Sequence, residues 1–415
     1  MSTNLTCCPF CGLVCDDVHI IKDDNGLHVS AAGCPRATNL FVVPNQGQAM
    51  VEGRPVSIEE AYRVAGMILK NTHRPLIGGL SCDVGGQRAA LACAEKLGGI
   101  VDHMNGDAQF HNWLAFQDGG WITTTLSEIR NRADLIVLCG ASLSQFPRFV
   151  ERCIGTGSQF GKLNRKLIVL SEDVSAELLS KCDSNIFIPI KSHQLGELFL
   201  AIQARINGSK LKARTIAGIS IQQVEALIED FLDAKYGVMV WNTAELEVPN
   251  VDMIVQTMVD VIKSLNKTTR WSGLPLGGND GDTSAAQVCT WQTGYPLRTA
   301  FESTGPHYEP ITFSTKRLLE NDEVDALVWI SAFDPRRVPP KAGCPTIVLG
   351  RADMNFDNYP DVFIPVGVPG IHHGGFLHRM DTVVVLPLQT HVSSTLDSVS
   401  DALCKIQRNI NHAVS

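Results

Sequence analysis

The chain has 415 residues, of which 44% are hydrophobic and 19% are charged, and its formal net charge at pH 7 is −8. This length provides for two or three domains with real cores, so an intrinsically disordered chain is excluded. The acidic balance lacks the basic footprint of proteins that bind nucleic acid or anionic membranes. Neither a signal-peptide pattern nor an apolar run of roughly 18–20 residues is found, so we expect a cytoplasmic protein with reduced thiols.

Thirteen cysteines are present, and five of them lie within the first 34 residues. Cys8, Cys11 and Cys15 have the spacing C-x2-C-x3-C, and Cys34 follows at a distance. Zinc sites usually pair two C-x2-C knuckles, whereas this spacing is more typical of a [4Fe–4S] cluster. The four thiols are therefore a candidate iron–sulfur site, with zinc or a loop without metal as the alternatives. Cys7 is the spare thiol.

The next segments alternate between helical and strand patterns. Ser57 and Glu60 form a capping-box pattern that predicts a helix up to Leu69, which Arg74-Pro75 ends. Short apolar runs without alternation then recur, and such runs are typical of strands buried on both faces of a parallel sheet. The predicted strands are 76–80, 133–140, 166–170, 185–190, 236–241, 326–330, 346–349, 362–365 and 383–386. The predicted helices are 87–97, 195–205, 221–233 and 252–265, and a glycine-rich loop is expected at 271–281.

This order of elements indicates an α/β fold with two doubly wound (Rossmann-like) sheet domains behind a small N-terminal Cys-rich domain. The glycines of 277–281 lack the dinucleotide-binding or P-loop pattern, so they are expected to form a turn. His372 and His373, near His378 and Asp381, suggest a metal site, but adjacent histidines on a strand point to opposite faces. A surface or interface loop is expected there. The chain has no nucleophile elbow and no zinc-protease motif, so it looks poorly equipped as an independent catalyst.

The segment Cys8–Asp17 resembles the N-terminus of the B subunit of the formylmethanofuran dehydrogenases, a family within the molybdopterin oxidoreductase superfamily. The likeness recurs at 74–76, 114–118, 131–134 and 287–296 and extends over essentially the whole chain. It implies a fold similar to formate dehydrogenase and DMSO reductase without the C-terminal barrel. The implied domains are a Cys-rich domain at 1–55, a discontinuous α/β domain at 56–128 and 300–415, and an inserted α/β domain at 129–299.

The same resemblance implies which residues would hold cofactors. In the family, four N-terminal cysteines hold a [4Fe–4S] cluster beside a tungsten or molybdenum bis-pterin, and a further Cys or selenocysteine ligates the metal. Counting back from 114–118 places that ligand at Ala108, which cannot coordinate a metal, and Phe110 stands where glycine would leave room for the pterin. Glu172 and Asp173 lie where the family carries the Asp-Pro-Arg segment that seats a pterin phosphate, and their charges would repel it. The resemblance therefore predicts that tungstopterin and molybdopterin are absent.

This combination is similar to the formyltransferase/hydrolase complexes of methylotrophic bacteria, which are relatives of the dehydrogenase without its redox step. The resemblance implies a non-redox structural subunit, without catalytic residues of its own, in a complex of one-carbon metabolism and formaldehyde oxidation. Such a complex converts formyl-tetrahydromethanopterin to formate by way of a furan carrier. The implied partners are the amidohydrolase-like A subunit, the β-helical C subunit and the formyltransferase D subunit.

Two other functions stay open at this point. The chain could be a working tungsten or molybdenum subunit in which Asp107 or His111 replaces the cysteine ligand, because aspartate ligates molybdenum in some relatives. It could also be an electron-transfer or sensing module built on the cysteine segment alone. Metal analysis of the purified protein separates these functions from the structural one.

Overall fold

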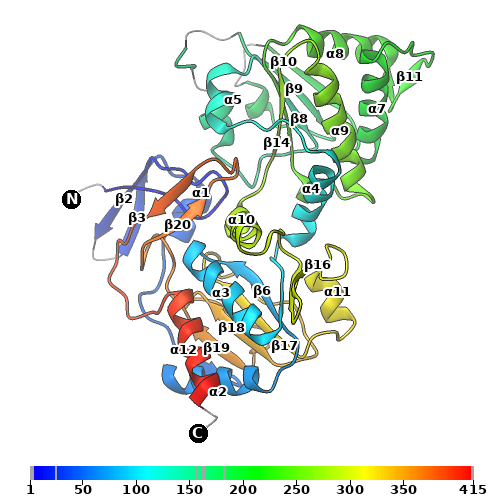
Figure 1. The fold of residues 1–415 in the computed structure, drawn as a ribbon. Helices are drawn as coiled ribbons and strands as arrows, with labels where there is room; N and C mark the ends of the chain where they lie inside the picture. Colours follow the sequence, from blue (N-terminus) through cyan, green and yellow to red (C-terminus); the bar gives the residue numbers. More distant parts are fainter. Residues whose placement is uncertain (1–3, 24–25, 156, 161–163, 181–183, 413–415) are drawn as a thin grey trace. The chain divides into compact units, whose positions relative to one another are not determined.

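The computed structural model describes residues 4–23, 26–155, 157–160, 164–180 and 184–412 (Figure 1). The chain divides into two compact units: unit 1 consists of Met1–Asp107 and Gly278–Ser415, and unit 2 consists of Ala108–Gly277. The mixed α/β class with several sheets is confirmed. The domain boundaries expected at 55, 128 and 299 stay predictions.

Unit 2 is built on a parallel sheet of five described strands. They are β8 (Leu135–Cys139), β9 (Lys166–Ser171), β10 (Ser184–Pro189), β13 (Gly237–Trp241) and β14 (Trp271–Pro275). Their order in the sheet is β10-β9-β8-β13-β14, and all neighbours pair in parallel. The chain adds β9 and β10 on one side of β8 and then β13 and β14 on the other. The sheet therefore has a topological switch point between β8 and β13, which is where open α/β sheets bind ligands.

Helices and a small hairpin complete unit 2 (Figure 1). They are α5 (Leu126–Arg132), the π-helix η1 (Val150–Ile154), α6 (Ala176–Leu179), the short η2 (Ser192–Gln194), α7 (Leu195–Ile206), the hairpin strands β11 (Thr215–Ile216) and β12 (Ile219–Ser220), α8 (Ile221–Asp233), η3 (Thr243–Glu245) and α9 (Val251–Leu265). The helix α4 (Gly106–Gly119) begins at the end of the first segment of unit 1 and continues into unit 2.

Two expectations for unit 2 are wrong. The glycine-rich segment that begins at Trp271 is a buried strand, β14, and not a loop. Gly273 lets this strand pack against the Trp241 ring, since a Cβ atom at Gly273 would lie 2.7 Å from that ring. The strand β10 was expected to be buried on both faces, but it is the edge strand of the sheet, and most of its side chains are partly or fully exposed.

Unit 1 contains a mixed sheet of nine described strands in the order β16-β15-β7-β6-β17-β18-β19-β4-β5. The strands are β4 (Met50–Val51), β5 (Arg54–Pro55), β6 (Pro75–Ser81), β7 (Ile100–Val101), β15 (Thr299–Glu302), β16 (Gly305–Tyr308), β17 (Ala326–Ser331), β18 (Thr346–Gly350) and β19 (Val362–Pro365). The five central strands are parallel, and short antiparallel strands close both ends. Here the switch point lies between β6 and β17.

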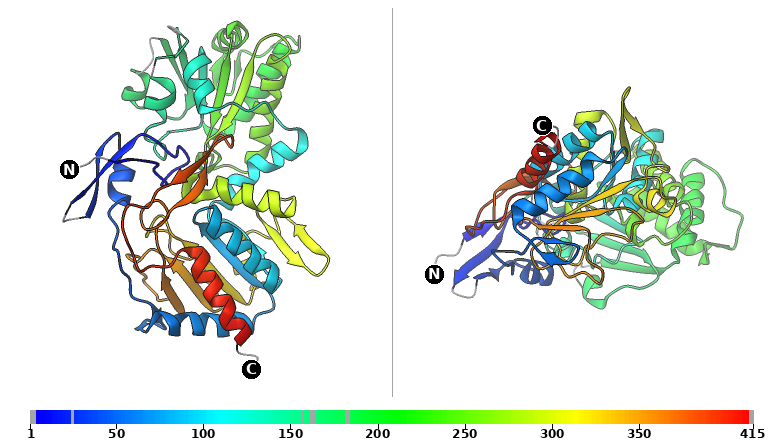
Figure 2. Two further views of the ribbon diagram at one scale, coloured as in Figure 1. Left: turned by 60° about the vertical axis from the view of Figure 1, so that its left-hand side comes forward. Right: turned by 90° about the horizontal axis from the view of Figure 1, so that it is seen from below.

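The other elements of unit 1 lie around this sheet (Figures 1 and 2). The helices are α1 (Pro35–Leu40), α2 (Ile58–Lys70), α3 (Val84–Leu97), the short η4 (Asn279–Gly281), α10 (Asp282–Thr293), α11 (Thr315–Glu320) and α12 (Val399–His412). A three-stranded antiparallel sheet consists of β1 (Asn4–Thr6), β2 (Val18–Asp23) and β3 (Gly26–Ala31), and a hairpin consists of β20 (Gly375–His378) and β21 (Val385–Leu388).

The C-terminal helix α12 lies beside α2 and α3, although more than 300 residues separate these segments (Figures 1 and 2). Gly66 allows the close approach of α2 and α12, because a Cβ atom there would lie 2.7 Å from the Cβ atom of Asn409. Tyr62 adds a hydrogen bond of 2.6 Å from its hydroxyl to the Asp397 carboxylate. These contacts fasten the C-terminal helix to the sheet domain.

Two further expectations for unit 1 need correction. The Ser57 hydroxyl accepts a hydrogen bond from the Glu60 backbone N–H as predicted, but the Glu60 carboxylate binds Arg63, so the capping box is only half formed. The run expected as a strand at 383–386 does not join the parallel sheet. Its last two residues begin β21, which pairs only with β20 in the described sheet pairings. None of the helices in the described ranges is both long and apolar enough to cross a membrane.

Candidate functional site

The four predicted cluster cysteines come together in unit 1. The Cys8 backbone N–H donates to the Cys15 carbonyl oxygen (2.8 Å), and the Val14 N–H donates to the Cys11 oxygen (3.0 Å), which folds the C-x2-C-x3-C segment into a tight loop. Cys34 is the N-cap of α1, where its sulfur accepts a hydrogen bond from the backbone of the first turn. Burial, together with the thiols of Cys11, Cys15 and Cys34, raises the pKa of Cys8 well above its usual value.

The donor set of this segment is four thiols, and thiolates are ligands both of [4Fe–4S] clusters and of structural zinc sites. Among the described residues no group of three or more His, Cys, Asp or Glu side chains is arranged to hold one metal ion. A zinc ion needs every sulfur about 2.3 Å from one point, whereas a cubane binds one thiolate at each of four irons. A [4Fe–4S] cluster on these four cysteines stays a prediction.

A charged network in unit 1 links the cysteine segment to the glycine-rich loop. Asp280 is 4% exposed, and it lies 3.7 Å from a guanidinium nitrogen of Arg36 and 3.3 Å from one of Arg337. Burial raises the pKa of the Asp280 carboxyl, while the two arginines oppose that rise. Gly278 contacts the cysteine loop directly, because a Cβ atom at Gly278 would lie 2.5 Å from the Gly12 Cα atom. Residues 278–281 of the predicted turn are therefore buried against the cysteine segment, and we call them the plug.

Burial shifts the pKa values of two neighbouring groups, Asp282 and His103, from their ordinary values. Burial raises the pKa of Asp282 to about 7, although the carboxylate accepts hydrogen bonds from Asn105 and from the Gly278 N–H. Burial also lowers the pKa of His103 to about 3. The His103 Nδ1 atom accepts from the Asn105 N–H (3.0 Å), so its Nε2 atom is the donor to the Asp280 carbonyl oxygen (3.2 Å). His103 is thus a neutral structural imidazole and has no free nitrogen for acid–base chemistry.

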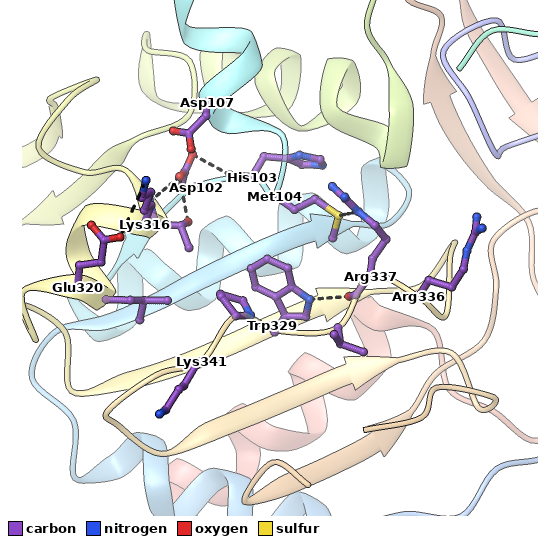
Figure 3. Close-up of a pocket in the computed structure, with 14 residues that line it drawn as sticks. Asp102, His103, Met104, Asp107, Lys316, Glu320, Trp329, Arg336, Arg337 and Lys341 are labelled. Atoms are coloured by element: carbon purple, nitrogen blue, oxygen red, sulfur yellow. Dashed lines mark hydrogen bonds and ion pairs between the residues drawn. The ribbon is translucent and has the colours of Figure 1, made fainter. Parts of the chain in front are cut away.

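A cavity of about 470 Å³ opens at the carboxyl ends of β7 and β17 (Figure 3). Its lining is Asp102, His103, Met104, Asp107, Thr315, Lys316, Leu319, Glu320, Trp329, Arg336, Arg337, Val338, Pro340 and Lys341. The Trp329 indole N–H donates to the Arg337 carbonyl oxygen (2.9 Å), and the Asp102 carboxylate accepts from the Thr315 hydroxyl (2.9 Å). This is the usual position of ligands in open α/β sheets.

The lining of the cavity carries charges of both signs. Lysine and arginine side chains occur beside the carboxylates of Asp102, Asp107 and Glu320, and Trp329 and Met104 add an indole and a thioether. The segment Asp334-Pro335-Arg336 follows β17 at this edge, where Asp334 holds Arg336 with hydrogen bonds of 2.9 and 2.7 Å. The resemblance placed the family's tripeptide after Leu170, where this chain has Glu172 and Asp173, and the tripeptide that follows β17 was missed. A search for Asp-Pro-Arg after every predicted strand would have found it.

The residues around the expected metal ligand have partners of their own. In unit 1 the Asp107 carboxylate accepts from the guanidinium of Arg298, a residue that is 1% exposed. In unit 2 the Ala108 carbonyl oxygen accepts a hydrogen bond of 2.6 Å from the Thr243 hydroxyl. His111 lies 3.7 Å from the Asp252 carboxylate. Both alternative ligands, Asp107 and His111, therefore have protein partners.

The histidine segment was expected to form a surface or interface loop, but several of its side chains are buried within the chain. His372 and His378 are each 7% exposed and Asp381 is 4% exposed. The His372 Nδ1 atom accepts from the Val368 N–H (3.0 Å), and His378 packs against the Trp291 ring. Arg379 holds Asp381 with hydrogen bonds of 2.7–3.1 Å. These residues stabilise the junction of the β20–β21 hairpin with α10.

Comparison with known proteins gives three curated relatives that match over most of their length. Two are the B subunits of tungsten-containing formylmethanofuran dehydrogenase 2, from Methanocaldococcus jannaschii (26% identity, 91% of each chain) and Methanococcus maripaludis (24% identity, 95% of each chain). The third is the B subunit of the Fhc formyltransferase/hydrolase complex of Methylorubrum extorquens, with 26% identity over 79% of this chain and 87% of the relative. No protein-family model matches the chain.

The fold is shared with a chain in the crystal structure of the formyltransferase/hydrolase complex FhcABCD from Methylorubrum extorquens, which was solved with methylofuran. The TM-score is 0.72 at 23% identity, and the match covers 88% of this chain and all of the other. The sequence matches confirm the resemblance seen in the cysteine segment, and the fold match extends over 88% of this chain. The homologues of this chain include the B subunits of formylmethanofuran dehydrogenase and of the formyltransferase/hydrolase complex.

Proposed function

We propose that this chain is a non-redox structural subunit of a formyltransferase/hydrolase complex that converts formyl-tetrahydromethanopterin to formate by way of a furan carrier in one-carbon metabolism. The observation that carries the proposal is Ala108. A methyl group occupies the position at which the redox relatives need a sulfur or selenium ligand, and without that ligand a tungsten or molybdenum centre cannot be held in the usual way. We propose as partners the amidohydrolase-like A subunit, the β-helical C subunit and the formyltransferase D subunit of such a complex.

The contacts of the neighbouring residues support this proposal. The Asp107 carboxylate is paired with the buried Arg298, and metal binding would take from that guanidinium one of its two carboxylate partners, Asp107 and Asp102. The exposed carboxylates Glu172 and Asp173 follow β9 in unit 2, where a pterin phosphate would need positive charge. The pairing of Asp107 disfavours metal coordination, and the charges of Glu172 and Asp173 disfavour a pterin phosphate. Together they favour a subunit without a metallopterin.

We further propose that Cys8, Cys11, Cys15 and Cys34 hold a [4Fe–4S] cluster that serves as a structural clip. The cluster would bind three thiolates of the C-x2-C-x3-C loop and the Cys34 thiolate at the start of α1, and so it would link the two segments covalently. The clip would fix the segment on which Gly278 packs, and so it would stabilise unit 1 without transferring electrons.

The test is to produce the chain together with its genomic partner subunits and to purify the assembly. We expect formate release from formyl-tetrahydromethanopterin that depends on the partner subunits. We also expect no pterin fluorescence, and iron and sulfide close to four per chain. Tungsten or molybdenum near one per chain would overturn the structural function, and an iron-free protein of full stability would overturn the clip.

A second function has one observation in its favour, because two of the relatives are named tungsten-containing enzymes. In that case Asp107 would be a metal ligand. The variant Asp107→Ala would then lose all activity and its metal, whereas the exposed Asp118→Ala control would not. Under the structural proposal both variants keep the formate-releasing activity of the complex.

A further inference from the structure

The switch point of unit 2 contains a carboxylate where a ligand would be expected. The loop that follows β8 begins at Gly140, and the loop that follows β13 begins at Asn242. These two strands are neighbours and parallel, so both loops leave the same edge of the sheet. In doubly wound sheets this edge offers backbone N–H groups to the phosphates of a ligand.

Here those donors point at Glu245. The Ser142 backbone N–H donates to Glu245 Oε2 at 2.6 Å, and the Asn242 side-chain amide donates to Glu245 Oε1 at 2.9 Å. Asn242 is 2% exposed, and its own Oδ1 atom is fixed by the Ala244 N–H at 3.2 Å. Ser142 follows β8 and Asn242 follows β13, so each side of the switch point donates one hydrogen bond to the Glu245 carboxylate. The two donors bind different oxygens of that carboxylate.

The backbone holds Glu245 in this place. The residue ends the short helix η3, and the next residue, Leu246, is 3% exposed. Leu246 packs over Gly140, whose φ is +59° and whose Cβ atom, if present, would lie 2.5 Å from the leucine side chain. The Leu246 side chain thus fills the space beside Gly140, and this contact positions the neighbouring Glu245 carboxylate.

We propose that the switch point of unit 2 is an anion site that its own Glu245 carboxylate fills, and that it takes a phosphate-class anion once this carboxylate is removed. A carboxylate and a phosphate both present negatively charged oxygens that accept such charge-assisted hydrogen bonds. The internal anion satisfies the Ser142 and Asn242 donors, so no phosphate of a bound cofactor is needed there. This inference deepens the proposed function, on which it rests, since it explains how unit 2 stays folded without a pterin phosphate.

The test is calorimetric titration of the full-length chain with sodium pyrophosphate at low ionic strength. The wild type should bind pyrophosphate weakly or not at all, because Glu245 competes and Glu172 and Asp173 after β9 repel the probe. Glu245→Ala should bind at least tenfold more tightly. The matched control is Glu247→Ala, an exposed carboxylate two residues away, which should behave as the wild type does. Adding Asn242→Ala to Glu245→Ala should abolish the gain.

Equal affinity of Glu245→Ala and Glu247→Ala for pyrophosphate would overturn the proposal. If Glu245→Ala does not fold alone, it should regain its circular-dichroism spectrum when pyrophosphate is added. Failure of this rescue, with Glu245→Gln folded and insensitive to pyrophosphate, would also overturn it. The metal content of the wild type tests the structural function separately, so the two proposals fail on different measurements.

Discussion

The Thr243 hydroxyl donates a 2.6 Å hydrogen bond to the backbone carbonyl oxygen of Ala108. The same hydroxyl accepts from the side-chain amide of Asn112 (3.2 Å), and the Asn112 oxygen accepts from the indole N–H of Trp241 (2.8 Å). This chain of hydrogen bonds connects the end of β13 to the first turns of α4 within unit 2. Ala108, the position at which the resemblance would place a metal ligand, is therefore held through its backbone in this protein.

Replacing Ala108 by cysteine should not create a metal enzyme. The variant Ala108→Cys restores the missing thiol but leaves Asp107 paired with Arg298 and leaves Glu245 at the switch point of unit 2. We expect less than about 0.1 tungsten or molybdenum per chain when the variant is produced with both metals supplied, since coordination also depends on the residues around the ligand. Elemental analysis against the wild type measures this. Near-stoichiometric metal in Ala108→Cys would show that the cysteine was the one missing part.

Arg298 should be one of the strongest stabilising residues of unit 1. It is 1% exposed, and it pairs with Asp102 at 3.4 Å, with Asp107, and with the Pro310 carbonyl oxygen at 2.6 Å. Arg298→Met would leave the buried Asp102 without its cation, and we expect a loss of about 3–5 kcal/mol in the free energy of unfolding. Denaturant unfolding measures it. The control Arg63→Met removes an exposed arginine that is paired with the exposed Glu60, and it should cost less than about 1 kcal/mol.

Local patterns in the sequence were enough to predict most of the strands. A continuous apolar run such as 166–170 is typical of a strand in a parallel sheet that helices cover on both faces. The strand β14 was missed because it contains a glycine and a proline. Glycine is needed at position 273 because the Trp241 ring occupies the space that a side chain would fill. Trp241 lies 32 positions away in the sequence, so no local pattern shows this contact.

In the candidate site, too, contacts between residues far apart in the sequence could not be predicted. The cysteine loop was predictable because its spacing is local and specific. The pairs of Arg298 with Asp102 and of Arg337 with Asp280 join segments far apart in the chain, and no local pattern marks them. Glu245 was missed for the same reason, since its role depends on Ser142, 103 residues before it. The strand order determines these contacts.

The stability of unit 1 should depend on pH through Asp282. Its folded pKa is about 7 and its ordinary value is 3.8, so between these values the folded state keeps a proton that the unfolded state loses. Stability therefore decreases as the pH rises from about 4 to about 7. Asp282→Asn mimics the protonated form and should remove a pH dependence of up to roughly 4 kcal/mol.

The measurement is the difference in free energy of unfolding between wild type and Asp282→Asn at several pH values. His103 contributes the opposite trend, because its folded pKa of about 3 lies below its ordinary 6.5 and its contribution is lost as the pH falls. It is present in both proteins and should largely cancel in the difference. A difference that stays constant from pH 4 to pH 8 would contradict the raised pKa of Asp282.

Two glycines with nearly the same backbone conformation provide a matched test of the contact between the glycine-rich plug and the cysteine loop. Gly278 has a φ of +84° and Gly294 has a φ of +85°. Alanine at either position therefore costs a similar strain of about 1–2 kcal/mol. Only at Gly278 would the new Cβ atom also collide with the loop, 2.5 Å from the Gly12 Cα atom, whereas nothing lies within 4 Å of a Cβ atom at Gly294. We expect Gly278→Ala to lower the melting temperature several degrees more than Gly294→Ala. If the proposed cluster is bound, Gly278→Ala should also reduce the iron content of the purified protein, whereas Gly294→Ala should leave it unchanged. Equal effects of the two substitutions would mean that the cysteine loop does not depend on the plug. The strain is common to both, and only Gly278→Ala adds contacts, with Gly12 and with the Thr283 hydroxyl oxygen at 3.3 Å.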